Sequence, residues 1–239
     1  MSDNSKHPRH MTLLDAGAPH LTKTERAIQA LRDAILRGTI PAGEQLTVGD
    51  LAYQLGMSPT PVREAIRILQ TEGLLKQTPH HTISAITFTE QDIADIFNLR
   101  AMLEAQAVRL ATPHLTADDF AELDDIDEQM RVAQAVGDHA AVHRINAEWH
   151  RTIYRASHNV HLVEIIESLW RKFLWESLWT VPNHTTTSLG QHAAITQAMR
   201  ARDAEGAAKL MAAHMDHGKD TAVRYFRQRH AEQQEETTL

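Results

Sequence analysis

The segment Ser58–Leu69 constrains the fold of this chain more than any other, because it fixes where a helix begins and which side the helix buries. Ser58 is a favourable N-cap residue, and Pro59 and Pro61 fall in the first turn, where a missing N–H costs little. Apolar side chains then recur at helical spacing, at Val62, Ala65, Ile66 and Leu69. The pattern predicts a helix that begins abruptly, buries one face and exposes the other.

The flanking residues predict a helix-turn-helix with a wing. Residues 46–55 have the spacing of a short helix that ends at Gly56, directly before the helix capped by Ser58. A further helix is expected upstream, over residues 21–37. Downstream, residues 74–77 and 82–86 can pair as two strands. Two helices joined by a sharp turn and followed by a hairpin are typical of a winged DNA-binding domain.

From Thr89 onward strand signals vanish. Helices are predicted over residues 90–112, 116–136, 138–157, 159–181, 187–202 and 203–229, and their short connections indicate a bundle. The fold class is therefore mainly α: an N-terminal winged helix-turn-helix over residues 21–87, with a small β-hairpin, and a C-terminal all-α six-helix bundle over residues 88–230. Residues 1–20 and 231–239 are polar and lack apolar spacing, so we expect a disordered arm and a disordered tail.

Composition excludes several classes of protein. Cysteine is absent from the 239 residues, which excludes disulfides and thiolate chemistry and suits a reducing cytoplasm. We expect no secretory signal and no membrane span, because residues 1–20 are polar and no apolar run is long enough. The first 89 residues carry 9 Lys and Arg against 8 Asp and Glu, whereas the rest carry 15 against 23. A metal site would have to come from the 16 histidines, 11 of which follow residue 89.

Two parts of the chain resemble one family of regulators. The segment LTVGDLAYQLGMSPTPVREAIRILQTEGLL, residues 46–75, resembles the winged helix-turn-helix of the GntR transcription regulators. The helical remainder resembles the ligand-sensing FCD domain of the FadR branch, through the motifs Leu99–Glu104, Asn146–His150, Gln191-His192 and Ala213-His214. Six helices rather than seven favour the VanR-like subgroup. The resemblance implies a homodimeric repressor that binds a double-stranded DNA operator and releases it when a small organic acid, often a carboxylate, binds the helical domain.

This sequence departs from its relatives at positions that bear on DNA recognition. Relatives commonly carry arginine where this chain has Pro59, and often where it has Gly49. The wing has His80-His81 in place of the usual glycine at its tip, which puts its insertion into the minor groove in doubt. More of the recognition therefore falls to the arginines of the predicted recognition helix.

That helix supplies the main candidate DNA contacts. Arg63 lies near its start and can bond a guanine edge or a phosphate; the alternative is a solvated arginine that pairs with Glu64 or Gln70. Arg67 lies one turn deeper and suits a phosphate as well as a base. The remaining candidates are Ser58 and Thr60 at the helix N-terminus and Lys76 and His81 on the wing. Capping alone would explain Ser58, and solvation alone would explain the wing residues.

A second set of candidates concerns metal binding. Asn146 and His150 are four residues apart, so both side chains leave one face of one helix. The resemblance implies that His192 and His214 join them around one divalent metal ion per chain, Zn²⁺ or Ni²⁺ for such donors. Taken without the resemblance, these histidines would be solvated or hydrogen-bonded core groups. Many relatives carry Asp at position 146, and a neutral amide offsets less of a metal's charge. Other histidines are assigned structural roles: His143, His158, His161 and His217.

The effector site follows from the same comparison. We hypothesise that the effector's carboxylate coordinates the ion and that Arg100 anchors its other end as a bidentate partner. The alternative is an intrahelical pair between Arg100 and Glu104, and the sequence leaves both open. A cluster of aromatic residues falls on the predicted 159–181 helix and is expected to pack in the core or a dimer interface: Trp170, Phe173, Trp175 and Trp179.

These observations favour a metabolite-responsive transcription factor over two alternatives. A metal-dependent, hydrolase-like enzyme could use the three histidines, but the chain has no HExxH motif, and Glu148 points about 160° away from the Asn146/His150 face. A helical interaction module with a vestigial winged domain is disfavoured by the retained arginines of the recognition helix. Specific DNA retention with a steep salt dependence would separate the first class from the other two.

Overall fold

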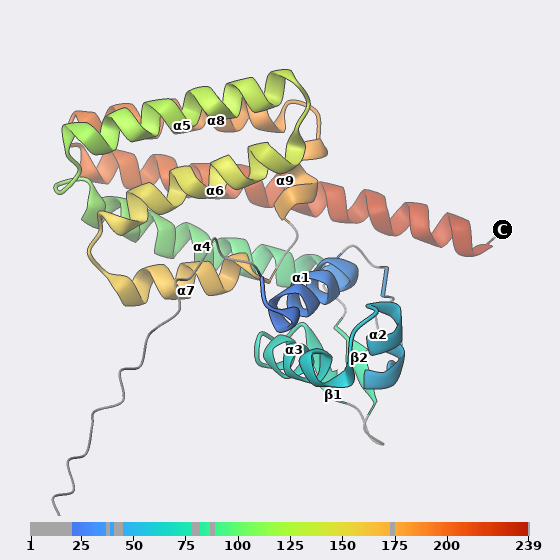
Figure 1. The fold of residues 1–239 in the computed structure, drawn as a ribbon. Coiled ribbons are helices and arrows are strands. Elements are labelled where there is room, and N and C mark those ends of the chain that lie inside the picture. Colours follow the sequence, from blue (N-terminus) through green and yellow to red (C-terminus); the bar gives the residue numbers. More distant parts are fainter. Residues whose placement is uncertain are drawn as a thin grey trace, which may run out of the picture.

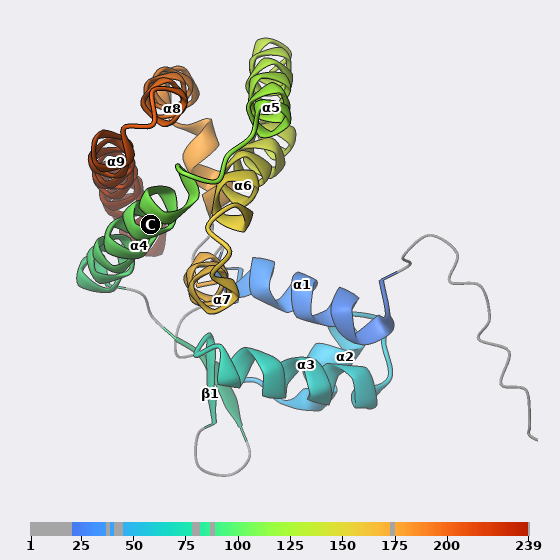
Figure 2. The ribbon, with the colours of Figure 1, turned by 90° about the vertical axis from the view of Figure 1, so that its left-hand side faces the viewer.

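The computed structural model describes residues 21–36, 39–40, 45–77, 82–86, 89–172 and 175–238, which form a small N-terminal domain below a larger helical domain (Figure 1). The N-terminal domain contains α1 (Lys23–Leu36), α2 (Val48–Gln54), α3 (Pro59–Thr71), β1 (Leu75–Gln77) and β2 (Ile83–Ala85). In the side view, the hairpin extends downward from the end of α3, away from the helical domain (Figure 2). The arrangement confirms the predicted winged helix-turn-helix.

The start of α3 is set by its prolines. Pro59 and Pro61 occupy the first turn, and Ser58 has the extended backbone of an N-cap residue. The Ser58 side chain nevertheless makes no capping hydrogen bond. The third helical position, which an N-cap side chain usually contacts, is Pro61 and has no N–H to donate. Capping therefore does not explain Ser58.

The helix-turn-helix is held by one small core. Gly56 ends α2 with a φ of +61°, a conformation that a residue without Cβ adopts at no steric cost. α3 turns its apolar side chains inward, and the core includes Ala27 and Leu31 of α1, Leu51 of α2 and Val62 and Leu69 of α3. Leu46 and Ile83 exchange two backbone hydrogen bonds, which ties the segment before α2 to the wing.

The wing is an antiparallel pair of strands in which Leu75 lies opposite Ala85 and Gln77 opposite Ile83. Leu75, Ile83 and Ala85 are buried, so the base of the wing belongs to the domain core. Residues 78–81, which include the candidate His81, lie outside the described residues, as do residues 1–20 with the predicted N-terminal arm.

The helical domain contains α4 (Glu90–Ala111), α5 (Ala117–Ala135), α6 (His139–Arg155), α7 (Val160–Trp170), the 3-10 helix η2 (Trp175–Thr180), α8 (His184–Arg200) and α9 (Ala204–Thr238). α4 lies against α9, α5 against α6, and α8 against α9 (Figures 1 and 2). Capping boxes begin α4 at Thr89 and α5 at Thr116. Each box satisfies two backbone N–H groups, which explains the sharp starts of both helices.

Two sequence predictions are wrong in this domain. The helix predicted over residues 159–181 ends at Trp170, and a separate 3-10 helix follows. The apolar spacing continues across the break, so the sequence carries no stop signal there. In the structure, Arg171 and Lys172, directly after the end of the helix, contact the N-terminal domain. The tail predicted to be disordered from residue 231 instead continues α9 to Thr238. This segment is rich in Ala, Glu and Gln, which favour helix without apolar spacing.

Among the described residues, no helix combines the length and the apolar character needed to cross a lipid bilayer.

Candidate functional site

The exposed face of α3 carries the candidate DNA contacts. Thr60, Arg63 and Arg67 are exposed on the side opposite the buried Val62 and Leu69. Glu64, the suggested partner of Arg63, instead accepts a hydrogen bond from Thr24 on α1 at 3.1 Å. Within the described part of the chain, neither the Arg63 nor the Arg67 guanidinium forms an ion pair or a hydrogen bond. Ser58 at the helix start and Lys76 on β1 are exposed as well.

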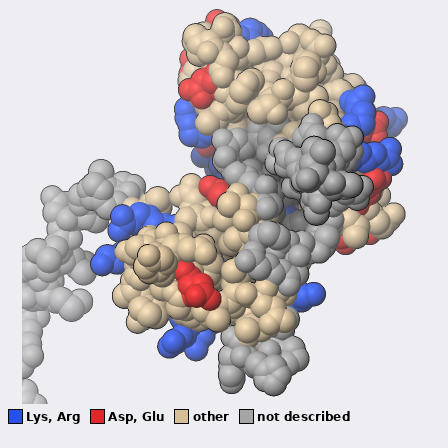
Figure 3. Space-filling view, turned by 90° about the vertical axis from the view of Figure 1, so that its right-hand side faces the viewer, with Lys and Arg blue, Asp and Glu red and all other residues tan. Residues whose placement is uncertain are grey.

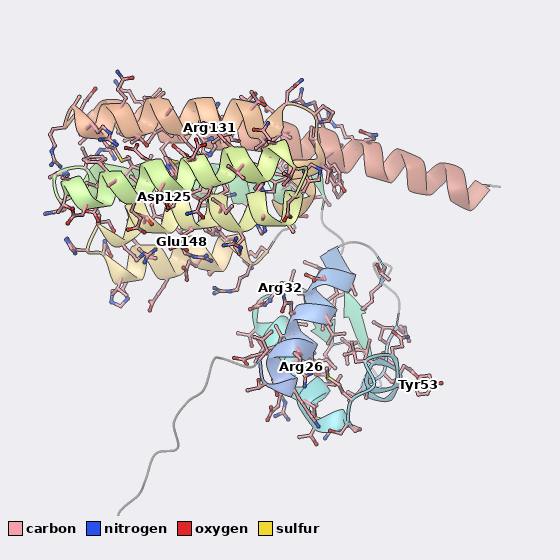
Figure 4. The ribbon with its side chains drawn as sticks, turned by 45° about the horizontal axis from the view of Figure 1, so that its top comes forward. Arg26, Arg32, Tyr53, Asp125, Arg131 and Glu148 are labelled. Atoms are coloured by element: carbon pink, nitrogen blue, oxygen red, sulfur yellow. The ribbon has the colours of Figure 1, made fainter. Side chains whose placement is uncertain are left out.

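Tyr53 is a neighbouring residue that sequence reasoning missed. It lies on α2, its side chain is 89% exposed, and it extends away from the domain (Figure 4). On one face of the molecule, Lys and Arg side chains lie near the edges of the N-terminal domain (Figure 3). An exposed aromatic ring with a hydroxyl can contact a DNA sugar and phosphate, but a lone tyrosine in a helix pattern gives no sequence signal.

In the helical domain, the structure brings together three of the four predicted metal-binding residues. The candidate ligand nitrogens of His150 on α6, His192 on α8 and His214 on α9 lie within 4.8 Å of one another. All three side chains are buried. Two of them, His150 and His214, line a cavity of about 500 Å³, its open mouth included.

Contacts behind two of the imidazoles determine which nitrogen faces inward. Nδ1 of His150 lies 2.8 Å from the hydroxyl of Tyr154, and that hydroxyl donates its proton to Glu104. Nδ1 of His150 must therefore donate to the tyrosine oxygen, which leaves Nε2 with a free lone pair. Nδ1 of His214 likewise donates to Oε1 of Gln191 at 2.7 Å. Partners of this kind fix the tautomer and orientation of metal-binding histidines.

His192 is fully buried and lies behind the residues that line the cavity. Its ring stacks on Trp149, with 3.8 Å between ring centroids and 3° between planes. Nδ1 lies 3.4 Å from Oδ1 of Asp127, yet neither ring nitrogen has a hydrogen-bond partner within the described ranges. Burial lowers the pKa of His150, His192 and His214, so all three rings are neutral near pH 7 and can coordinate a cation.

Asn146 is the fourth candidate donor. It lies one helical turn before His150 and lines the same cavity. Its Oδ1 is buried and finds no hydrogen-bond partner in the described part of the chain. A buried, unpartnered amide oxygen beside three neutral imidazoles is costly unless a ligand satisfies it. Three nitrogen donors and one oxygen donor fit a borderline divalent ion such as Zn²⁺. The residues present therefore fit the metal that the family comparison implies.

Arg100 lines the cavity from α4, but part of its guanidinium is engaged. Its Nε donates to Oε1 of the fully buried Glu104 at 2.6 Å, which is the intrahelical pair that the sequence offered as the alternative. Trp170 also donates to Glu104, at 2.9 Å. Trp170 and Trp179 both line the cavity from different elements, so they do more than pack in the core. Phe173 and the side chain of Trp175 lie outside the described part.

The two domains meet at Glu72, which follows the last residue of α3. Its carboxylate binds Arg32 of α1 at 2.6 Å and lies 3.5 Å from Arg171, which follows α7. Lys172 donates to the backbone carbonyl of Glu72 at 3.0 Å. The end of the recognition helix is thus attached to the residues that directly follow the cavity-lining Trp170.

Comparison with known proteins identifies both domains. Residues 23–81 match the family described as bacterial regulatory proteins, gntR family, and residues 95–217 match the FCD domain. The chain belongs to the GntR family. The HTH-type transcriptional regulator McbR of Escherichia coli (strain K12) is 30% identical over 81% of this chain and 89% of that protein. A probable D-xylose utilization operon transcriptional repressor of Paenarthrobacter nicotinovorans is 33% identical over 65% of this chain and 70% of that protein.

A solved structure of E. coli McbR/YncC agrees with this assignment: its TM-score is 0.69 at 29% identity, and the match covers 87% of this chain and 99% of that one. As a GntR-family member, the protein is a DNA-binding transcription regulator with an effector-binding FCD domain, not an enzyme. The hydrolase alternative is therefore wrong. Consistent with this, Glu148, the candidate general base of that alternative, pairs with Arg155 and does not line the cavity.

Proposed function

We propose that this GntR regulator is a homodimeric repressor whose operator binding is controlled by a small organic acid bound beside a divalent metal ion. The observation that carries the proposal is the convergence of three buried, neutral imidazoles, two of which line the cavity. Asn146, His150, His192 and His214 hold Zn²⁺ or Ni²⁺, which supplies positive charge for a carboxylate. Because all four donors are neutral, the effector's negative charge balances the ion.

On the DNA side, Arg63 and Arg67 contact bases or phosphates, with Ser58, Thr60, Lys76 and His81 as further contacts. Two guanidinium groups on an exposed helix face, unpaired with any described residue, support this role. Leu99 and Met102 are 49% and 71% exposed on one side of α4, which supports burial against a second copy of the chain. Such a regulator acts where the operator is, in the cytoplasm.

Glu72 connects the two sites. An effector in the cavity contacts Trp170, and the next two residues contact the end of the recognition helix. A shift at the end of α7 therefore changes the position of α3. In the cavity itself, Arg100 is the residue that would bind the far end of the acid. Coupling of this kind needs about 1–3 kcal/mol of difference between two states.

Elemental analysis of untagged protein, purified without chelator, tests the metal site. We expect about one zinc or nickel ion per chain, a marked loss in His192→Ala, and no loss in His161→Ala, whose side chain is 86% exposed outside the cluster. A metal content near zero in the wild type, even after incubation with Zn²⁺, would refute the metal site.

The coupling has its own test, a Glu72→Gln variant measured on a DNA fragment selected from a random pool. Its DNA affinity without added acid should stay within a few-fold of the wild type, while the change caused by Zn²⁺ and an organic acid should shrink. Glu128→Gln is the matched control, because Glu128 pairs with Arg131 on the surface of α5. An unchanged response in Glu72→Gln would exclude this connection.

A further inference from the structure

A second group of unsatisfied polar atoms belongs to residues that line the same cavity and are not among the proposed metal ligands. Nδ1 of His184, Oγ of Ser188 and Nε1 of Trp179 are buried and have no hydrogen-bond partner among the residues that the structure describes. All three residues line the cavity, and each is at least nine-tenths buried. Buried polar groups without partners are rare in folded proteins, so three in one cavity wall indicate a ligand that satisfies them.

The positions of His184 and Ser188 on α8 separate them from the metal-binding histidine of the same helix. His184, Ser188 and His192 follow one another at intervals of four residues and share one side of the helix. At 1.5 Å per residue, His184 lies about 12 Å along the axis from His192, and Ser188 about 6 Å. The cavity thus has a metal-binding end and a second polar end, and Met215 and Gly218 of α9 line it as well.

The chemistry of the second end favours an acceptor. An indole N–H only donates, and a serine hydroxyl and a neutral imidazole can donate too. Burial lowers the pKa of His184 to about 4, so its ring is neutral near pH 7. His184 is also the first residue of the 17-residue helix α8, whose N-terminal amides favour negative charge. An acceptor-only group such as a carboxylate satisfies all these donors together.

We infer that His184, Ser188 and Trp179 form a second carboxylate subsite, so that the effector is a dicarboxylic acid held between this subsite and the metal-binding end. The inference rests on the proposed function, because it takes the first carboxylate to lie beside the ion. The proposed function assigned the far end of the acid to Arg100, whereas this inference places the second carboxylate on α8 and η2. The Nε of Arg100 is already engaged by Glu104.

The test compares straight dicarboxylates, from malonate to adipate, with monocarboxylates of equal carbon number, from propionate to hexanoate. Binding to the Zn²⁺-loaded, full-length protein is measured by isothermal titration calorimetry. One dicarboxylate should bind at least about ten-fold more tightly than its monocarboxylate partner. Ser188→Ala should lower the affinity for the dicarboxylate about ten-fold, as expected for the loss of one hydrogen bond to a charged group. The affinity for the monocarboxylate should not change.

His184→Gln should have the same selective effect, while Ser168→Ala, which removes a serine hydroxyl bonded to a carbonyl within α7, should have none. If both series bind equally well, or if Ser188→Ala weakens neither, the second subsite is refuted and the metal-bound carboxylate stands. If no acid of either series binds the zinc-loaded protein, the carboxylate effector itself is refuted, and the subsite with it.

Discussion

The neutral, buried ring of His184 should make the stability of this protein depend on pH in a way that one substitution removes. Burial lowers the pKa of His184 from 6.5 to about 4, and the nearby His217, whose ring centroid is 5.7 Å away, adds to the effect. In the unfolded chain, the same ring should titrate near its ordinary pKa of about 6.5. Between these values the unfolded state binds a proton that the folded state does not.

The sign follows from that difference. Stability rises with pH wherever the unfolded state binds more protons, so it falls as pH drops from about 7 toward 4. At pH 7 the two states hardly differ in protonation at this site. At pH 5 the unfolded ring is almost fully protonated and the folded ring is not, which costs about 2 kcal/mol relative to pH 7.

Urea unfolding of the wild type and of His184→Gln, at pH 7, 6 and 5 with a chelator present, measures this contribution. Glutamine does not titrate, and the other buried histidines contribute equally to both proteins. The free energy of unfolding of the wild type, minus that of the variant, should therefore fall by about 2 kcal/mol from pH 7 to pH 5. A difference that stays constant within about 0.5 kcal/mol would show that His184 is not held neutral by burial.

Further predictions concern other parts of the molecule. Tyr154→Phe removes the hydroxyl that orients a buried imidazole and should weaken Zn²⁺ binding about 10–100-fold in competition with a chelating dye; unchanged affinity would contradict the orienting role. Gly218→Ala places a Cβ 2.8 Å from the ring of Phe97 and should lower the free energy of unfolding by about 1–3 kcal/mol, whereas Gly190→Ala, with open space around it, should not destabilise. Arg63→Ala should reduce affinity for selected DNA about 10–100-fold by fluorescence anisotropy; an equal loss on every sequence would assign Arg63 to phosphate rather than base.

Much of the N-terminal domain could be predicted because its signals are local. The prolines after Ser58, the apolar spacing of α3 and the glycine at position 56 act within a few residues of the structure they determine. The histidines that meet in the cavity were identified through the family resemblance, since their spacing alone did not show that three separate helices converge. The structure supplies that convergence.

The partners of those histidines could not be predicted, because they come from distant parts of the chain. The Glu104 carboxylate accepts hydrogen bonds from the hydroxyl of Tyr154, 50 residues away, and from the indole N–H of Trp170, 66 residues away. Neither pair has a spacing that a helix or strand would impose. The break after Trp170 was missed for a related reason, because the contacts of the next residues with Glu72 depend on how the two domains lie together.

The prolines at the start of α3 also bear on the thermodynamics of DNA binding. Each proline ring restricts φ near the helical value, so the first turn has few other conformations to lose on binding. Complex formation then needs to order mainly the side chains of Thr60 and Arg63, at about 0.5–1.5 kcal/mol for a long side chain, and not the backbone that carries them. The recognition helix is therefore preorganised. It loses less conformational entropy on binding DNA than a helix that must complete its first turn on the operator, so less of its binding free energy is offset.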